Sequence, residues 1–501
     1  MSNLHAFPLP FVWKCDKISG KSATGQTFRN MISVSCGKPE KLCQTRREIT
    51  VRLTFRGGVH PKGRKELSRE VPLRRFDPGP GEMVFPLAQH IGKPAKAIVK
   101  KNDPVLVGQK LAEADGFVSA CVISSCSGKV KAVEKRRTIA GTMSECVVVD
   151  NDGAYTPIDG LGQKQELSHL TNQDILNRVK EAGIIGLGGA GFPTHVKLAP
   201  KEPDRIKYLI ANGAECEPYI SCNDQLMRSH AAGIVEGLEL ALRLFPHAEC
   251  VVAIEDNKPE AIAAMQKAVA GKARMRVLPL HTKYPQGGER SLIRVIAGVD
   301  FPVSMLPADV GCIVLNVGTA YAIGRAVAWN EPLFSHVLTV TGEAVQTPAN
   351  FIARDGTSLA QLLEACGGVK AGVTPKKALS GGPMMGVAVA SLELPIQKNT
   401  NALTLLAEDP VERAERQQTV CLHCGRCSTI CPNGLVPALM ADAIAMQNWG
   451  RYENKLHGLE CIACGSCTYI CPAKRPLTQM FKQTKAEIMA RKRAAQAGGK
   501  A

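Results

Sequence analysis

The sequence of 501 residues has few aromatic side chains, with seven Tyr, three Trp and 13 Phe. It contains no helix-turn-helix, zinc-finger or RNP pattern, so its formal net charge of +17 does not by itself indicate nucleic-acid binding. The N-terminal residues lack an apolar stretch of signal-peptide length, and the most apolar later stretch, residues 310–329, is interrupted by Asn316 and Arg325. No membrane span is predicted. We expect the basic surface to contact an acidic protein partner or anionic lipid.

Eight of the 19 cysteines form two copies of one pattern, in which two-residue spacings join three cysteines and a fourth follows after three residues, before a proline. The two runs are Cys421, Cys424, Cys427 and Cys431, then Cys461, Cys464, Cys467 and Cys471. Zinc sites and disulfides are the alternatives, but zinc sites stop at four ligands and disulfide frameworks suit small secreted chains. The repeated run is typical of two-cluster ferredoxins, which hold two [4Fe-4S] cubes. Electron transfer is the predicted chemistry.

The resemblance to two-cluster ferredoxins implies crossed ligation, because the fourth cysteine of each run there binds the other cluster. On that pattern Cys471 completes the cube of the first run. Cys431 completes the cube of the second run. Crossing implies cubes close enough to exchange electrons.

Length and a hydrophobic content of 45% predict several domains. Residues 1–50 show no sustained period, and we expect a poorly ordered extension. Residues 51–155 contain short strand-like runs broken by turn signals, which predicts a small β-sandwich. That stretch resembles a lipoyl or biotinyl domain, but Ala114-Asp115-Gly116 stands where those families carry the modified lysine. We therefore predict a structural module.

Residues 156–330 alternate helical and strand patterns. Residues 174–183 and 231–245 read as helices, and residues 206–210 and 250–254 as strands. Such alternation predicts an α/β domain with a largely parallel sheet, in which ligands bind at strand ends.

One loop of this region, residues 186–197 (GLGGAGFPTHVK), contains G-x-G-x-x-G. The match to a Rossmann fingerprint is weak, because a helix precedes the loop and Pro193 interrupts the segment after it. Closely set glycines nevertheless let backbone N–H groups approach a phosphate or a flat ring, and Lys197 adds a positive charge. A plain glycine turn is the alternative.

Three further motifs follow in order, namely residues 211–218 (ANGAECEP), 284–290 (YPQGGER) and 315–319 (LNVGT). With the glycine loop they resemble the flavoprotein subunit of respiratory complex I, which binds FMN and NADH. The module order and the segments FRGGVHP, QHIGKPA, EADGFVSA and GLGGAGFPTHVKL are still more similar to the RnfC subunits of Rnf electron transport complexes. Such a complex is an ion-translocating oxidoreductase between ferredoxin and NAD. The resemblance covers roughly residues 52–481.

The resemblance implies a set of FMN- and NAD(H)-binding residues, with Phe192 near the nicotinamide. They are Gly188, Gly189, Gly191, Phe192, Lys197, Asn212, Glu215, Glu217, Glu289, Asn316 and Thr319. Ala214 and Gly288 replace carboxylates of the flavoprotein pattern, which leaves the nucleotide contacts open. No general base or covalent nucleophile is required, so no catalytic residue is assigned. We expect His195 and Cys216 to pack or hydrogen-bond.

The remaining segments complete a multidomain α/β and α+β fold class. Residues 335–390 resemble the soluble-ligand-binding β-grasp (SLBB) domain of this family, which we interpret as a structural spacer. Residues 380–386 form a loop expected to return towards the flavin. Residues 400–485 are the helical two-cluster ferredoxin-like domain, and residues 486–501 are a basic tail with a short helix.

The predicted function is that of a peripheral subunit on the cytoplasmic side of the cell membrane, within an ion-translocating redox complex. It is expected to exchange hydride between NAD(H) and FMN, and to pass single electrons through two [4Fe-4S] clusters. Other subunits of the complex are the expected partners, with ferredoxin as an indirect one and no nucleic acid. Two alternatives remain: a flavin and iron-sulfur cobalamin reductase of a microcompartment, or a non-catalytic electron wire and docking subunit.

Overall fold

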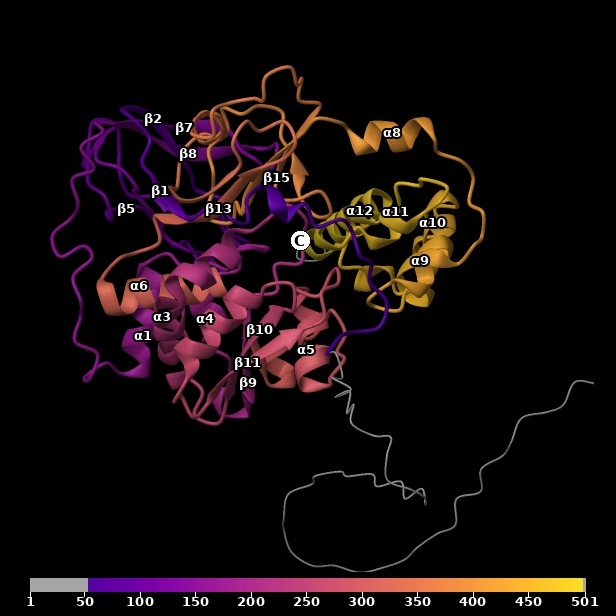
Figure 1. The fold of residues 1–501 in the computed structure, drawn as a ribbon, viewed down its shortest axis with the longest axis horizontal. Coiled ribbons are helices and arrows are strands. Elements are labelled where there is room, and N and C mark those ends of the chain that lie inside the picture. Colours follow the sequence, from indigo (N-terminus) through magenta and orange to yellow (C-terminus); the bar gives the residue numbers. More distant parts are fainter. Residues whose placement is uncertain (1–52, 499–501) are drawn as a thin grey trace, which may run out of the picture. The chain divides into compact units, whose positions relative to one another are not determined.

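The computed structural model describes residues 53–498. The extension predicted for residues 1–50 lies outside them. The described part contains four β-sheets followed by a helical C-terminal region (Figure 1). None of its helices combines the length and the apolar character that a membrane crossing needs.

The first region is a β-sandwich, as the turn-broken strand runs predict. Its strands are β2 (Gly81–Pro86), β3 (Lys96–Ala97), β4 (Pro104–Val105), β5 (Lys110–Glu113), β6 (Val122–Ile123), β7 (Gly128–Arg137) and β8 (Met143–Asn151). They form two sheets, in the orders β2-β8-β7-β4 and β3-β5-β6. Phe85, Leu111 and Val147 are fully buried between them.

The second region is the expected α/β domain. Its parallel sheet has the order β11-β10-β9-β12 and consists of β9 (Tyr208–Asn212), β10 (Glu249–Glu255), β11 (Met275–Leu280) and β12 (Cys312–Asn316). Its helices are α1 (Asn172–Glu181), α2 (Thr194–Lys197), α3 (Cys222–Arg243), α4 (Pro259–Val269), α5 (Glu289–Ala297) and α6 (Val317–Trp329). The alternation of the sequence is thus confirmed.

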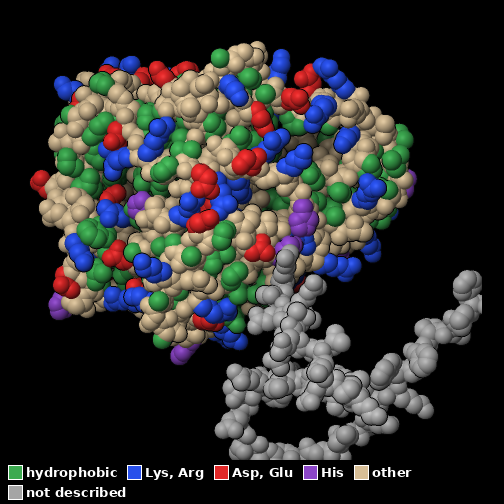
Figure 2. Space-filling model, in the orientation of Figure 1, with side chains coloured by type: hydrophobic (Ala, Val, Ile, Leu, Met, Phe, Trp, Pro, Cys, Tyr) green, Lys and Arg blue, Asp and Glu red, His purple; other side chains and the backbone are tan. Residues whose placement is uncertain are grey.

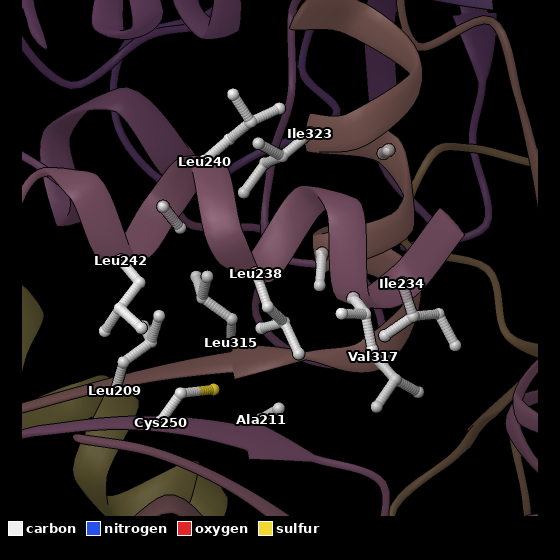
Figure 3. Close-up of a cluster of buried hydrophobic side chains, with 14 of the residues drawn as sticks. Leu209, Ala211, Ile234, Leu238, Leu240, Leu242, Cys250, Leu315, Val317 and Ile323 are labelled. Carbon is white, nitrogen blue, oxygen red and sulfur yellow. The ribbon is translucent and has the colours of Figure 1, made fainter. Parts of the chain in front are cut away.

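The core of this domain forms where α3 and α6 cover one face of the sheet (Figure 3). Leu238 of α3 and Ile323 of α6 meet Leu209 and Leu315 of the strands in one buried cluster. Burying such a side chain stabilises the fold by roughly 1.5–3 kcal/mol. This packing holds β9 and β12 against α3 and α6.

The third region is a six-stranded sheet of order β1-β14-β13-β17-β15-β16. Its elements are β1 (Arg74–Phe76), β13 (Ser335–Thr341), β14 (Ala349–Arg354), α7 (Leu359–Glu364), β15 (Lys377–Ser380), β16 (Val387–Ala388) and β17 (Ala402–Leu406). β1 and β17 lie outside the predicted range 335–390. The short strand β1 joins from far earlier in the chain by pairing in parallel with β14.

The C-terminal region is helical. It contains α8 (Pro410–Arg416), α9 (Arg426–Thr429), α10 (Pro437–Ala445), α11 (Ser466–Ile470) and α12 (Leu477–Gly498). A one-turn π-helix spans Arg451–Lys455, and 3-10 turns occur at Lys65–Leu67, Pro203–Arg205, Pro307–Val310 and Gly458–Glu460. Tyr452, Phe481 and Met440 form the core of this region. The helix expected in the basic tail is the end of α12 rather than a separate element.

Candidate functional site

The parallel sheet reverses its direction of growth at β9 and β12, and the region outside the carboxyl ends of these two strands is called the crevice. From β9 the chain adds β10 and β11 on one side and then returns to add β12 on the other. Such a reversal opens a crevice outside the strand ends, where ligands bind in open α/β sheets. Asn212 and Asn316 are the last residues of the two strands and are register partners. Both predicted asparagines therefore lie at this crevice.

The glycine loop lies against the same crevice. Gly188 has a φ of +78°, and a Cβ there would lie 3.0 Å from Asn316 Nδ2. The Leu187 N–H donates to Thr319 Oγ1 at 2.9 Å, which ties the loop to the start of α6. Gly188, Gly189 and Ala190 are exposed, so their backbone remains accessible to a ligand. The loop requires glycine for its conformation and for its close approach to Asn316.

Two charged side chains meet beside the loop. Lys197 Nζ lies 3.0 Å from Glu289 Oε1 and donates to the Val314 carbonyl at 3.0 Å. Asn212 Nδ2 donates to the Gly287 carbonyl at 2.9 Å, which brings the 284–290 motif to the end of β9. The structure thus gathers the glycine loop, Lys197, Asn212, Glu289, Asn316 and Thr319 around one crevice. Phe192 is half-buried at the base of the loop, where its carbonyl accepts from Gly186 N–H.

The other two predicted carboxylates are engaged by the protein itself. Glu215 accepts hydrogen bonds from the Asn223 and Asp224 N–H groups at the start of α3. Glu217 accepts from the Met384 N–H at 2.7 Å, within the loop of residues 380–386. Burial raises the pKa of both carboxyl groups. Their nucleotide-binding role stays a prediction, whereas their loop-fixing contacts are visible.

Lys65 is a buried residue of this region that the motifs did not reveal. Its Nζ donates to the carbonyls of Glu217 and Ile220, and lies 3.9 Å from Glu215 Oε2. Burial lowers the pKa of Lys65, although Glu215 opposes that shift. The lysine stands in a polar segment before the sandwich, and no local pattern marks a residue whose partners lie more than 150 positions away.

Several buried polar atoms beside the crevice have no partner within the described part of the protein. They are Thr194 Oγ1, His195 Nδ1, and both Nε2 and Oε1 of Gln286. Burial and the nearby Lys180 lower the pKa of His195 to about 4, so its imidazole is neutral at pH 7. Unsatisfied buried polar groups are rare in native proteins and call for a partner. An exposed glycine loop, a lysine and unsatisfied donors and acceptors fit a phosphate-bearing flavin such as FMN.

Cys216 forms a hydrogen bond within the protein, as expected. Its Sγ accepts a hydrogen bond from the Gly287 N–H at 3.3 Å, and burial raises the pKa of its thiol. A raised pKa keeps the thiol protonated at neutral pH, and a protonated thiol is a poor nucleophile. The residue instead joins the 211–218 motif to the 284–290 motif.

The eight cysteines of the two runs line two separate cavities. Cys431 lines one with Cys461, Cys464 and Cys467, and this is called the near cavity. Cys471 lines the other with Cys421, Cys424 and Cys427, and this is called the outer cavity. Each cavity thus combines three cysteines of one run with the fourth of the other. This grouping is the one that crossed ligation requires.

Within residues 53–498, no three His, Cys, Asp or Glu side chains converge closely enough to hold one metal ion. A zinc ion needs ligand atoms about 2.0–2.3 Å from a single point. Four thiols line each cavity, and this donor set fits a [4Fe-4S] cube.

Hydrogen bonds of one loop join the near cavity to the crevice. Tyr284 Oη donates to the Cys464 carbonyl at 2.7 Å, and Gly287, three residues later, holds Asn212. Gly58 N–H donates to the Ile430 carbonyl at 2.7 Å, beside Cys431. Val59, Tyr284 and Cys464 also belong to one buried apolar cluster, against which Cys216 and Met384 pack. The loop of residues 281–288 therefore touches both the crevice and one cysteine cavity.

Comparison with known families and proteins agrees with this geometry. Family models match as an RnfC barrel sandwich hybrid domain at residues 53–154, a Nuo51 FMN-binding domain at 179–325, an SLBB domain at 337–388 and a 4Fe-4S dicluster domain at 413–472. The fold class predicted from the sequence is confirmed.

Two curated relatives match over nearly their whole length. The C subunit of the Na(+)-translocating ferredoxin:NAD(+) oxidoreductase complex of Acetobacterium woodii is 42% identical over 88% of this chain and 98% of its own length. The proton-translocating counterpart of Clostridium ljungdahlii is 39% identical over 87% and 94%. A solved NAD+-reducing [NiFe]-hydrogenase covers 65% of this chain and 62% of its own, at 18% identity and a TM-score of 0.45, a likeness too slight to carry a conclusion. The chain belongs to the RnfC family, the C subunits of ion-translocating ferredoxin:NAD oxidoreductase complexes.

Proposed function

We propose that this chain is the NAD(H)-linked subunit of a membrane-bound, ion-translocating ferredoxin:NAD oxidoreductase complex. It exchanges hydride between NAD(H) and FMN at the crevice and passes single electrons through two [4Fe-4S] clusters. It attaches peripherally, through other subunits, on the cytoplasmic side of the membrane. The RnfC relatives and the FMN-binding and dicluster domain matches support this function.

One observation carries the proposal: a single loop joins the crevice to the near cavity. Gly287 holds Asn212 at the crevice, and Tyr284 holds the Cys464 carbonyl at the cavity. A two-electron donor site placed beside a one-electron carrier needs an intermediary between them. FMN, when bound, accepts two electrons as a hydride and releases them one at a time.

The residues of the crevice bind and orient rather than transfer protons. Backbone N–H groups of Gly188 and Gly189 are accessible for a phosphate or the ring, and Lys197 supplies positive charge beside them. Asn212 and Asn316 fix the two strand ends on which the ring would lie. Holding two reactants in one geometry removes much of the entropic barrier to reaction.

The cysteine ligation belongs to the same proposal. Cys461, Cys464, Cys467 and Cys431 hold the cube of the near cavity, and Cys421, Cys424, Cys427 and Cys471 hold the cube of the outer cavity. The near cube is the one that exchanges electrons with the flavin, because Tyr284 connects its cavity to the crevice. The outer cube then exchanges electrons with a partner.

The test is cofactor analysis of the chain purified without oxygen. We expect flavin absorbance, about eight irons per chain on the two-cube pattern, and NADH-dependent reduction of an artificial dye. Lys197→Met should weaken FMN binding about tenfold through loss of a charge-assisted contact, whereas exposed Lys201→Met should not. Zinc in place of iron, or no flavin after reconstitution, contradicts the proposal.

The same purification separates the alternatives. A non-catalytic electron wire would contain the cubes but would show no NADH-dependent dye reduction. A microcompartment cobalamin reductase would reduce cobalamin and would copurify without membrane subunits. Pull-down of the native assembly therefore identifies which of the three functions the chain serves.

A further inference from the structure

The loop over the outer cavity is exposed along its whole length. Every residue of 415–426 is exposed except Cys421, which is half-buried. Val420 keeps 82% and Leu422 60% of its surface accessible, and the ligand position Cys424 is itself exposed. Leu422 lines the outer cavity together with Ala438 of α10, so this loop and the start of α10 border one space.

Exposed apolar side chains concentrate in the region of the cysteines. Among the described residues, 20 large hydrophobic side chains are exposed, and eight of them lie within residues 410–489. That segment is less than a fifth of the described chain. Four of the eight are Leu422, which lines the outer cavity, and Val420, Val436 and Leu439, which lie within two positions in the sequence of its lining residues Cys421 and Ala438. These four side chains are called the outer rim.

The charge of the two cysteine segments has one sign, although Glu415 and Asp442 lie near them. The two segments that carry the cysteines, residues 417–434 and 461–476, contain Arg426, Lys474 and Arg475 but no Asp or Glu. None of these three basic residues forms an ion pair within the part of the chain that the structure describes. Figure 2 shows hydrophobic and basic side chains over α9 and α10, at the right of the view.

We propose that the outer rim, with Arg426 and Lys474 around it, is the docking surface for an electron-carrying subunit of the same membrane complex. That subunit presents an apolar centre bordered by Asp and Glu. The proposal rests on the proposed function, since an exposed cube ligand serves electron exchange only with a carrier that docks over it. Apolar centres with complementary charged borders are typical of lasting interfaces, whereas brief redox encounters bury less surface.

Two other occupants fit the surface less well. Residues 1–52 contain nine Lys and Arg against three Asp and Glu, so their charge has the same sign as the rim. A second copy of this chain would likewise place Arg426 and Lys474 against basic groups in a two-fold contact. A partner with an acidic border avoids both repulsions.

The test replaces one apolar and one basic residue of this surface by acidic residues in the complete complex. Val420→Asp with Lys474→Glu places two carboxylates on the rim without touching a cysteine. Met143→Asp with Lys129→Glu makes the same changes at two exposed positions of the β-sandwich, of which Met143 is 58% accessible. Each variant carries an affinity tag and is recovered from cells that make every subunit of the complex.

We expect the rim variant to retain membrane subunits at least about tenfold less than the wild type, because central interface residues dominate binding. The sandwich variant should retain them fully. Iron content and NADH-dependent dye reduction should stay unchanged in both, which shows that the flavin and cubes are intact. Equal recovery of membrane subunits by the two variants overturns the docking surface while leaving the proposed function in place.

Two further outcomes would show that another occupant covers the outer rim. If deletion of residues 1–50 releases a protected Val420→Cys thiol to a maleimide in the isolated holo chain, the occupant is the N-terminal segment and the proposal is wrong. If the rim variant turns a dimer of the isolated chain into a monomer, the occupant is a second copy and the proposal is equally wrong. If the wild-type chain shows no NADH-dependent dye reduction, that result contradicts the proposed function. It does not bear on the docking surface, which the recovery of membrane subunits tests.

Discussion

The near and outer cavities have the same cysteine spacing but opposite surroundings. Cys464 is buried and Tyr284 holds its carbonyl, while Gly58 holds the Ile430 carbonyl beside Cys431. Cys424 of the outer cavity is exposed. One cube site is thus held by elements from the rest of the chain and the other is open to solvent. We propose that the two identical ligand motifs serve different ends, an inward contact to a flavin and an outward contact to a partner.

The largest expected effect tests whether the cavities share ligands across the two runs. Cys431→Ser should remove the near cube and Cys471→Ser the outer cube, each lowering iron from about eight to about four per chain on the two-cube pattern. Iron analysis with electron paramagnetic resonance of the reduced protein identifies the surviving cube. Only the Cys431→Ser protein should also lose rapid electron transfer from NADH to the remaining cube.

Ligation within each run, rather than across the runs, predicts the opposite result. If each serine damages the cube of its own run, the crossed grouping of the cavities does not reflect ligation. Cys366→Ser is the control, since this buried cysteine lies in the β-grasp core and outside both runs.

The next comparison uses two glycines that share a backbone conformation. Gly57 has a φ of +83° and Gly425 a φ of +71°, but a Cβ on Gly57 would lie 2.8 Å from the Ile430 carbonyl oxygen, whereas Gly425 has open space. Alanine at either position should cost about 1–2 kcal/mol for the left-handed backbone. Only Gly57→Ala should displace the Cys431 loop and slow flavin-to-cube electron transfer. Freeze-quench spectroscopy measures that rate.

Equal slowing in the Gly425→Ala protein would contradict this distinction, because it would mean that backbone strain alone disturbs the cubes. Thermal unfolding of both variants separates general destabilisation from the local effect. We expect a lower midpoint for Gly57→Ala, which adds the clash to the backbone strain, and slower electron transfer in that variant alone.

Much of this arrangement was predictable from the sequence. The cysteine spacing, the alternation of helices and strands and the glycine loop are local patterns, and the fold class that they predicted is confirmed. Other features depend on distant contacts. β17 enters the β-grasp sheet between β13 and β15, and no short-range pattern marks that position.

The start of α3 shows the physical reason for such misses. The apolar period predicted a helix from residue 231, but α3 begins at Cys222. Its first turns bury Asp224, which pairs with Arg69 at 3.0 Å, so polar residues occupy positions where an amphipathic helix shows apolar ones. The partner lies 155 positions earlier in the chain. Gln286 was missed likewise, because burial without a partner leaves no trace in the sequence.

A third prediction concerns the flavin side of the near cavity. Gln286 is fully buried with both side-chain polar atoms unpaired among the described residues, in the loop that joins the crevice to the cavity. Gln286→Leu should raise the melting temperature of the flavin-free chain by about 2 °C, because an unsatisfied buried amide costs about 1–3 kcal/mol. The same change should weaken FMN binding about tenfold if the amide bonds the flavin.

Calorimetry of the flavin-free chain and fluorescence titration with FMN measure the two effects. If Gln286 has only a structural role, Gln286→Leu should lower both the melting temperature and the affinity for FMN. Asn350→Leu is the matched control, because this buried amide already bonds Ser68, Ser221 and Thr339 and should only destabilise.

The smallest expected effect compares Tyr284, which bonds the near cavity, with Tyr469, which is exposed. Tyr284→Phe removes the hydroxyl that bonds the Cys464 carbonyl, and should cost about 1 kcal/mol, the usual net value of one hydrogen bond. Tyr469→Phe changes an exposed ring, 47% accessible, and should shift stability by less than about 0.5 kcal/mol. Denaturant unfolding of the holo chain gives both values.

Because Tyr284 also connects the crevice to the near cavity, its variant should alter the spectrum of the near cube alone. An equal spectral change in the Tyr469→Phe protein would mean that both cubes sense the protein surface alike, and the contrast between a held and an exposed cube would then fail.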